Sequence, residues 1–155
     1  MRIAIGSDEK TKTTEDVVDY LKSQGRDVAL FGALVKPLPA GRQVKANWVD
    51  VAKEVALTVK NRKADEGILF CWTGTGVAMA ASKIPGIRAA TVSDLKTAKN
   101  ARAWNHANIL ALSCFMPAKK AVKIVGTWLK TPYSTDPDDL ESIKKLERLG
   151  QELSR

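Results

Sequence analysis

The fold is decided by one stretch of the sequence, Gly67-Ile68-Leu69-Phe70-Cys71-Trp72-Thr73-Gly74-Thr75-Gly76. Its opening is apolar without interruption, which is typical of a strand buried on both faces of a parallel sheet. The glycines after Cys71 let the backbone turn tightly and approach a ligand. Apolar and small residues then recur at helical spacing, at Val77, Ala80, Ala81 and Ile84. The stretch therefore predicts a strand, a loop and a helix of an α/β protein.

The rest of the chain repeats this alternation of short apolar runs and helical patterns. We expect strands over residues 2–6, 27–31, 67–70, 87–92 and 109–112. We expect helices from near Thr13 with a capping box to Asp16, over 48–59, 77–84, 94–104 and 118–129, and in a tail from Pro137 to Leu153. The pattern predicts a doubly wound five-stranded parallel sheet in a three-layer α/β/α sandwich with a C-terminal tail helix. The 155 residues are expected to form a single domain, 1–155.

Composition narrows the function classes. No run approaches the ~18 apolar residues of a membrane helix, and the first residues lack the pattern of a signal peptide, so we expect a cytoplasmic protein with no membrane partner. Cys71 and Cys114 are expected to be free thiols. The single histidine, His106, excludes a multi-histidine metal centre, and no metal site is expected. The net charge of +8 favours anions, but basic residues are spread along the chain and no nucleic-acid motif occurs, so nucleic acid is not expected as a partner.

Candidate ligand-binding residues gather around predicted strand ends. In doubly wound sheets, ligands bind beyond the carboxyl ends of the strands. Asp8 and Glu9 follow the first strand, and the loop from Cys71 to Gly76 follows the third. We expect Asn105 and His106, which come before the fifth strand, to converge on the same edge.

The Cys71 loop has the parts that proton transfer requires. Because the loop opens a helix, its unpaired amides and the helix dipole favour an anion and the thiolate form of a nearby cysteine. A thiolate could remove a proton beside a carbonyl while the amides of Gly74, Thr75 and Gly76 hold the enediolate oxygen and Thr73 bonds the reacting hydroxyls. The alternative is that Cys71 is a small core residue, as buried cysteines commonly are. Cys114 lacks such a loop and is interpreted as core.

Several segments carry a resemblance to a known family. The stretch from Gly67 to Met79, followed by Pro85-Gly86-Ile87-Arg88-Ala89-Ala90, resembles the C-G-T-G-x-G and P-G-I-R-A-A motifs of the ribose-5-phosphate isomerase B and galactose-6-phosphate isomerase family. The opening Ile3-Ala4-Ile5-Gly6-Ser7-Asp8 and the segment Asn108-Ile109-Leu110 are also similar, so the resemblance spans Met1 to Leu129. It implies a doubly wound fold and interconversion of aldose and ketose phosphates through an enediol, without metal or cofactor.

The resemblance also implies roles for individual residues. Cys71 would be the proton-transferring base and Thr73 its hydroxyl partner, with the Gly74 to Gly76 amides as the anion hole. Asp8 would contact sugar hydroxyls, and Asn105 would contact the substrate. Family members form dimers with shared active sites, so we expect a homodimer or a dimer of dimers that binds a small-molecule sugar phosphate.

Several positions depart from the family pattern. Glu9 stands where histidine is common, Trp72 replaces the first loop glycine, Trp104 occupies the position of the ring-opening histidine, and Phe115 that of an arginine. The tail segment 134–139 replaces a glycine–arginine segment that grips phosphate. We therefore count Glu9 and Trp72 as substrate-binding candidates and His106 as the candidate catalytic histidine. The candidates for phosphate binding are Arg42, Lys45 and Arg102.

Two main functional hypotheses follow. The first is an aldose–ketose isomerase that acts on a phosphorylated sugar with Cys71 as base. The second is a catalytically impaired relative that binds a sugar phosphate or serves as the partner subunit in a hetero-oligomer. A basic nucleic-acid-binding module is the weaker third. Among the tryptophans, Trp48 and Trp128 fit the apolar faces of helices, and Trp72 and Trp104 are the candidates to line a pocket.

Overall fold

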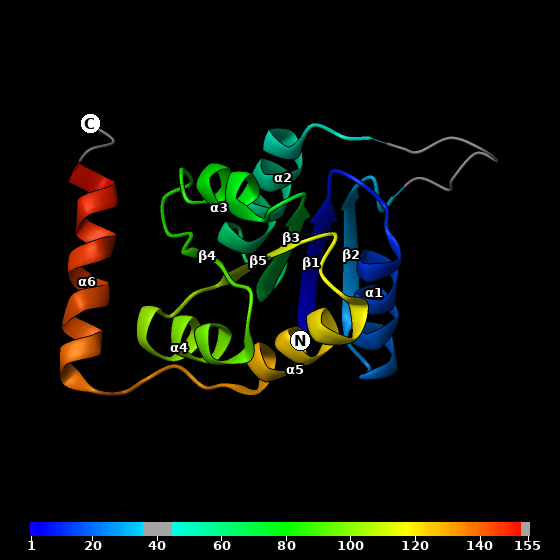
Figure 1. The fold of residues 1–155 in the computed structure, drawn as a ribbon. Helices are drawn as coiled ribbons and strands as arrows, with labels where there is room; N and C mark the ends of the chain where they lie inside the picture. The colour runs from blue at the N-terminus through cyan, green and yellow to red at the C-terminus, as the bar shows by residue number, and fades with distance from the viewer. Residues whose placement is uncertain (36–44, 153–155) are drawn as a thin grey trace.

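The computed structural model describes residues 1–35 and 45–152, and within them a five-stranded, all-parallel sheet lies at the centre (Figure 1). The strand order is β2-β1-β3-β5-β4. The strands are β1 Arg2–Ser7, β2 Asp27–Gly32, β3 Glu66–Cys71, β4 Ala89–Thr91 and β5 Ile109–Ser113. Each of the five predicted strands is present. β1 leads to β2 on one side and β3 leads toward β4 on the other, so the connections reverse direction between β1 and β3.

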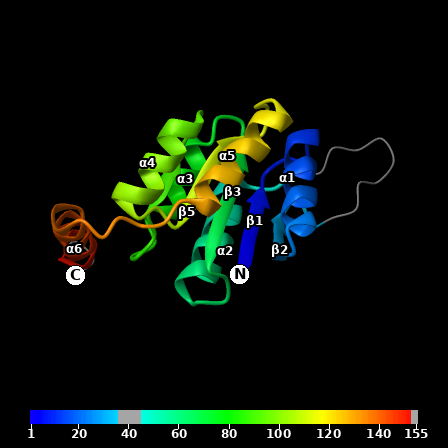
Figure 2. The same cartoon turned by 90° about the horizontal axis from the view of Figure 1, so that it is seen from below.

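Helices cover both faces of the sheet and make the predicted three layers. They are α1 Lys12–Ser23, α2 Trp48–Lys60, α3 Thr75–Ala81, α4 Leu95–Asn105, α5 Ala118–Lys130 and α6 Pro137–Glu152. Buried residues of α1, α4 and α5 pack with one set of strand side chains, including Ile5 and Phe70. Those of α2 and α3 pack with the alternate set, including Ala4 and Leu69. Figure 2 shows α1 and α5 on one side of the sheet and α2 on the other.

The N-terminus of α1 corrects one detail of the prediction. The capping box of α1 is formed by Thr11 and Thr14, and not by Thr13 and Asp16. Thr13 is instead buried, and its hydroxyl donates to the Met116 carbonyl at 2.6 Å. The hydroxyl residues at positions 11, 13 and 14 allow a helix capped by Thr11 or by Thr13. The bond from Thr13 to Met116 occupies the Thr13 hydroxyl, so Thr11 caps the helix.

Two tryptophans of the helices differ in burial. Trp128 of α5 is fully buried, as its position on the apolar face predicts. Trp48 is 42% exposed at the first position of α2, so the prediction that it is core is wrong. A helix start has few neighbours to cover so large a ring.

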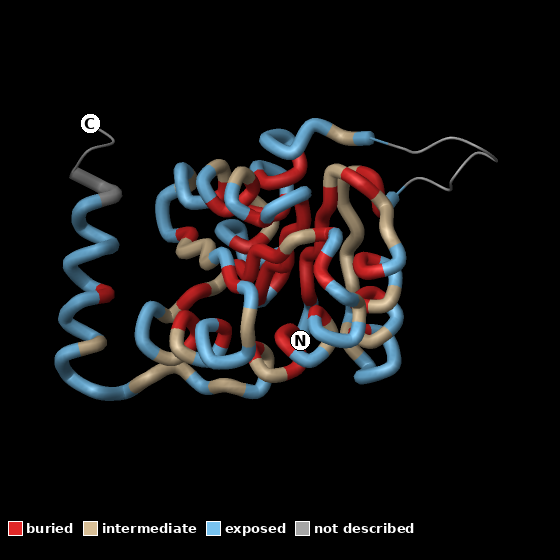
Figure 3. The backbone as a smooth tube through the Cα atoms, in the orientation of Figure 1, coloured by how far each residue is buried: buried red, intermediate tan, exposed pale blue. Residues whose placement is uncertain are grey.

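The tail helix α6 stands apart from the sandwich (Figures 1 and 3). It begins at Pro137, as predicted, and the Asp136 carboxylate accepts a hydrogen bond from the Asp138 N–H at 2.9 Å. Of its apolar stripe only Ile143 is buried. The other members of the stripe are exposed, namely Leu140, Leu146 and Leu149. No helix in the described parts of the chain is long and apolar enough to cross a membrane.

Candidate active site

The loop that follows β3 depends on glycine at position 74. Gly74 has a φ of +80°, in the left-handed region that favours glycine. A Cβ atom there would lie 2.9 Å from the backbone carbonyl carbon of Leu112 in β5. Gly76 lies against the Trp48 ring, which would be 3.3 Å from an added Cβ. The two glycines thus bring the start of α3 close to both the sheet and α2.

The Cys71 sulfur lies at the edge of the core, inside this loop. Its Sγ accepts a hydrogen bond from the Gly74 N–H at 3.2 Å, which engages one of the three amides predicted to hold an anion. Cys71 keeps 6% of its surface exposed, while the surrounding loop residues Trp72 and Thr73 are exposed. Cys71 is therefore almost wholly buried, beneath a loop whose residues Trp72 and Thr73 face solvent.

The second cysteine is a core residue, as predicted. Cys114 is 1% exposed and packs with the helices of the α1 face. Burial, with smaller contributions from Asp8 and Glu9, raises the pKa of the Cys114 thiol to about 12. This thiol is protonated at neutral pH and is not available as a base.

Hydroxyl groups line the entrance to the loop. Thr73 Oγ1 and Thr75 Oγ1 share a hydrogen bond of 2.7 Å, and both residues are exposed. The Ser113 hydroxyl, at the end of β5, donates to the Trp72 carbonyl at 2.6 Å and fixes the backbone beside Cys71. The exposed Thr73 hydroxyl is thus positioned by its neighbour in the same loop.

Two carboxylates from the end of β1 lie at the same edge, because β1 and β3 are neighbours with Ser7 paired to Phe70. Asp8 Oδ1 is buried, and within the described residues no hydrogen-bond partner faces it. Burial, and after it the charge of Glu9, raises the pKa of Asp8 above its ordinary value. Lys45, from the segment before α2, approaches Glu9 with Nζ 3.4 Å from Oε1.

Trp72 joins these strand ends. Its indole N–H donates to Glu9 Oε1 at 3.0 Å, and its ring meets the Phe115 ring edge to face at 5.3 Å between centroids. Glu9 is only 3% exposed, whereas Trp72 is 60% and Phe115 57% exposed. The sequence named Glu9 and Trp72 as separate candidates. It did not predict the hydrogen bond between them or the ring contact of Trp72 with Phe115. The available signal was that all three follow strands that end at one edge of the sheet.

Asn105 and His106 lie at the opposite edge, which corrects the prediction that they converge with Cys71. Ile109, the first residue of β5, pairs with Gly67, and Ser113, the last, pairs with Cys71. The segment before Ile109 therefore lies at the amino edge of the sheet. Ile109 and Ser113 are four residues apart along β5, which is roughly 13 Å, so Asn105 and His106 lie still farther from Cys71. In a parallel sheet a chain enters each strand at the edge opposite to the one where it leaves.

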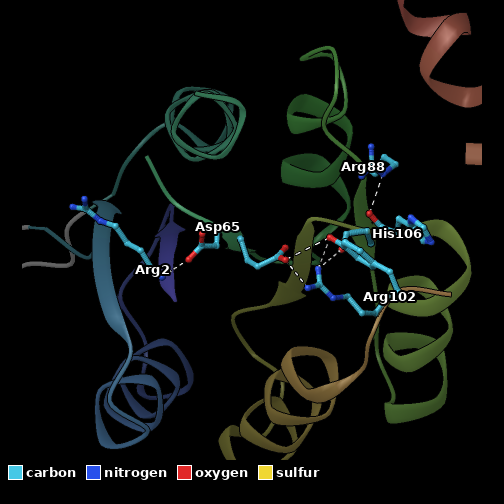
Figure 4. Close-up of polar contacts among 8 residues, drawn as sticks. Arg2, Asp65, Arg88, Arg102 and His106 are labelled. Atoms are coloured by element: carbon cyan, nitrogen blue, oxygen red, sulfur yellow. Dashed lines mark hydrogen bonds and ion pairs between the residues drawn. The ribbon is translucent and has the colours of Figure 1, made fainter. Parts of the chain in front are cut away.

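His106 is held by the segment that leads to the tail. Its Nε2 is 3.0 Å from the Ser134 carbonyl oxygen, and its ring stacks on Tyr133 at 4.5 Å between centroids. The Arg88 Nε donates to the His106 carbonyl (Figure 4). Within one chain, His106 is a structural residue of the amino edge.

Arg102 is also remote from the Cys71 loop and is unavailable to a phosphate in this chain. Arg102 is 6% exposed and forms an ion pair with Glu66 at the start of β3. Figure 4 shows Arg102 next to His106. Its guanidinium lies between two rings, 4.5 Å from the Trp128 centroid and 4.1 Å from that of Tyr133. Burial raises the pKa of Glu66, and Arg102 opposes this shift. Of the other phosphate candidates, Lys45 lies near Glu9, and Arg42 is outside the described residues.

A cavity of about 510 Å³ lies between α6 and the segment around β4, away from the Cys71 loop. Its lining is largely apolar and includes Ile84, Leu146 and Asn105, with an Arg88–Glu147 ion pair of 3.1 Å. Asn105 is the one predicted site residue in this lining. Among the residues that the structure describes, no group of three His, Cys, Asp or Glu side chains could hold a metal ion.

The chain has relatives of known class. Residues 3–146 match the Ribose/Galactose Isomerase family. The ribose-5-P isomerase B of Listeria innocua is 36% identical over 86% of this chain and 87% of its own length. The D-erythrulose-4-phosphate isomerase of Pectobacterium atrosepticum is 32% identical over 97% of this chain and 93% of its own. The structure of Clostridium thermocellum ribose-5-phosphate isomerase B superposes with a TM-score of 0.87 at 33% identity, covering 99% of both chains. The strand order, the Cys71 loop and this extent of similarity together show that the chain belongs to the ribose/galactose isomerase family of sugar-phosphate isomerases.

Proposed function

We propose that this protein is an aldose–ketose isomerase that acts on a phosphorylated sugar, with Cys71 as the proton-transferring base. The observation that carries the proposal is the Gly74 N–H to Cys71 Sγ hydrogen bond of 3.2 Å, at the start of a helix. A donor aimed at the sulfur stabilises a thiolate more than a thiol. Asp8, Trp72 and Thr73 lie around the same loop as candidate sugar-binding residues.

The proposed reaction moves hydrogen between neighbouring carbons and needs no redox partner. The Cys71 thiolate removes the proton from C2 of the open-chain aldose, and the carbonyl oxygen on C1 takes a proton from a water molecule, which gives the enediol. The thiol then returns its proton to C1, while the hydroxyl on C2 gives its proton back to water and becomes the ketone. The amide of Gly76 and the Thr73 hydroxyl, to which the Thr75 N–H already donates at 3.4 Å, would stabilise the charged oxygen between these steps.

A second copy of the chain would complete the site. Asn105 lies at the amino edge, too far along the sheet to reach Cys71 of its own chain, and the resemblance implies active sites shared between two subunits. The exposed stripe of α6 gives such a dimer apolar surface to cover. We therefore propose a homodimer, alone or as half of a tetramer, in which Asn105 of one copy meets the Cys71 loop of the other.

Shared sites can be tested by complementation. Cys71→Ala and Asn105→Ala should each be inactive as homodimers. Mixed after denaturation and joint refolding, they should recover about a quarter of wild-type activity, because half of the dimers are mixed and each holds one intact site. No recovery, with mixed dimers demonstrated by mass, would contradict the shared site.

The second candidate function is binding without turnover, or service as the partner subunit of a hetero-oligomer. It is favoured by the engagement of His106 with Ser134 and Tyr133 and of Arg102 with Glu66. Neither side chain is available within the chain for ring opening or phosphate binding.

One experiment separates the two candidates. The purified full-length protein is incubated with aldose and ketose phosphates of four, five and six carbons, and interconversion is followed by NMR. Isomerisation of at least one pair, lost by about 100-fold or more in Cys71→Ala, supports the enzyme. Cys114→Ala is the matched control and should retain activity. Binding measured by calorimetry without turnover supports the second candidate, and neither binding nor turnover contradicts both.

A further inference from the structure

Trp72 lies at the position where doubly wound sheets bind their ligands. The connections from the strands reverse between β1 and β3, and ligands of doubly wound sheets bind at that reversal, beyond the carboxyl ends. Glu9 follows β1 and Trp72 directly follows β3, so their hydrogen bond of 3.0 Å crosses the reversal point. The contact with Phe115, in the turn after β5, extends the aromatic surface over the end of the next strand.

The indole is held rigidly in this position. Its N–H is bound to the carboxylate of Glu9, a side chain that is 3% exposed and is itself approached by Lys45. The Trp72 and Phe115 rings meet edge to face, and the Ser113 hydroxyl donates to the Trp72 carbonyl at 2.6 Å, which restrains the backbone of Trp72. These three contacts come from two segments, the loop after β1 and the end of β5 with the turn after it, and together they hold the ring in place. A side chain with 60% of its surface exposed needs such restraints to stay in one orientation.

We propose that Trp72 is the residue that sets the chain length of the sugar, with Glu9 as its positioning residue. The inference rests on the function proposed above, because it takes an open-chain sugar phosphate as the ligand. A ligand that reaches both the Cys71 sulfur and the Asp8 carboxylate must share the strand ends with the Trp72 ring. We expect a chain of four or five carbons to lie beside the ring, and each further carbon to meet it. The site should therefore discriminate against six-carbon phosphates.

Open-chain acids test this without requiring turnover. The probes are 4-phosphoerythronate, 5-phosphoribonate and 6-phosphogluconate, whose carboxylate resembles the enediolate, and the measurement is Kd by calorimetry. Wild-type protein should bind the better of the two shorter acids at least about 10-fold more tightly than the six-carbon acid, the size of effect that one excluded methylene produces. Trp72→Gly should reduce this ratio to about threefold or less, through tighter binding of the six-carbon acid.

Variants of Trp72 and Glu9 separate the effect of the orientation of the indole ring from the effect of its size. Trp72→Phe keeps most of the ring but removes the N–H, so it should lose part of the ratio. Glu9→Gln retains an oxygen that accepts from the indole and should keep the ratio, whereas Glu9→Ala should lose it. A change in fold stability alone would alter all three Kd values together and leave their ratio intact. Met79→Ala, at a 68% exposed position further along α3, is the surface control.

The outcomes are distinct. Equal weakening of all three acids in Trp72→Gly overturns the inference, because the ring would then only stack on the sugar. An unchanged ratio in Trp72→Gly also overturns it. Failure of all three acids to bind wild-type protein overturns the inference and the sugar-phosphate site together. Length-selective binding without isomerisation supports the inference while the catalytic proposal fails.

Discussion

The Gly74 N–H donates to the Cys71 sulfur across a turn of three residues, at 3.2 Å. The turn closes only because residue 74 adopts a φ of +80° and has no Cβ to meet Leu112. The geometry of the thiol therefore depends on a single glycine. This dependence and three other features of the structure give testable expectations.

Gly74→Ala should be markedly destabilising. The left-handed backbone costs a residue with a Cβ roughly 1–2 kcal/mol, and here a contact of 2.9 Å with Leu112 is added. Gly25→Ala is the matched control, since Gly25 has a φ of +68° but nothing within 4 Å of an added Cβ. Urea unfolding should show a larger loss for Gly74→Ala. Equal losses would mean that the loop shifts to accommodate the methyl group at no cost.

Cys71 and Cys114 should differ in reactivity. Because burial raises the pKa of Cys114 to about 12, its thiolate is scarce at neutral pH. A thiol reagent such as DTNB should modify no more than one cysteine of the native protein, and mass spectrometry should place the label on Cys71. In Cys71→Ala, labelling should require urea. Rapid modification of Cys114 under native conditions would contradict the packing described for it.

Arg102→Met should destabilise the protein in a pH-dependent way. Burial already raises the pKa of Glu66 above its ordinary value of 4.5, and Arg102 lowers it. Without Arg102 the folded pKa rises further. A carboxyl group with a raised folded pKa contributes stability below its unfolded pKa and loses that contribution as pH rises through its folded pKa. The deficit relative to wild type should therefore be small near about pH 4.5 and grow toward ~3–5 kcal/mol at neutral pH.

The measurement is urea unfolding of both proteins across that range of pH. Lys12→Met removes a solvent-exposed ion pair with Asp16 and serves as the control, with an almost unchanged midpoint. A deficit for Arg102→Met that shrinks as pH rises would show that Glu66 does not remain buried and unpaired in the variant.

His106 should contribute to stability through two separable contacts. His106→Ala loses both the stack on Tyr133 and the bond to the Ser134 carbonyl, for a loss of about 1–2 kcal/mol. His106→Phe keeps a ring against Tyr133 and should lose roughly half of that. Thermal unfolding of the two variants checks the order. If Phe is as damaging as Ala, the stack contributes little.

The sequence alone determined the architecture. Period-two and period-3.6 patterns are local properties, so the strand ending at Cys71, the helices on either side and the tail helix from Pro137 could be predicted from neighbouring residues. The requirement for glycine in the loop could be predicted for the same reason. The burial of Cys114 also followed, because it has no loop to expose it.

Tertiary structure alone decided which of the predicted residues meet. The bond between Trp72 and Glu9 joins residues 63 positions apart, and it exists because β1 and β3 are neighbours in the sheet. The same strand order and direction put Asn105 and His106 at the opposite edge and gave Arg102 a buried carboxylate partner. Local patterns specify which face of an element is apolar, but the order of strands depends on how all the faces are buried together. Contacts between distant loops therefore emerge only when the whole chain has packed.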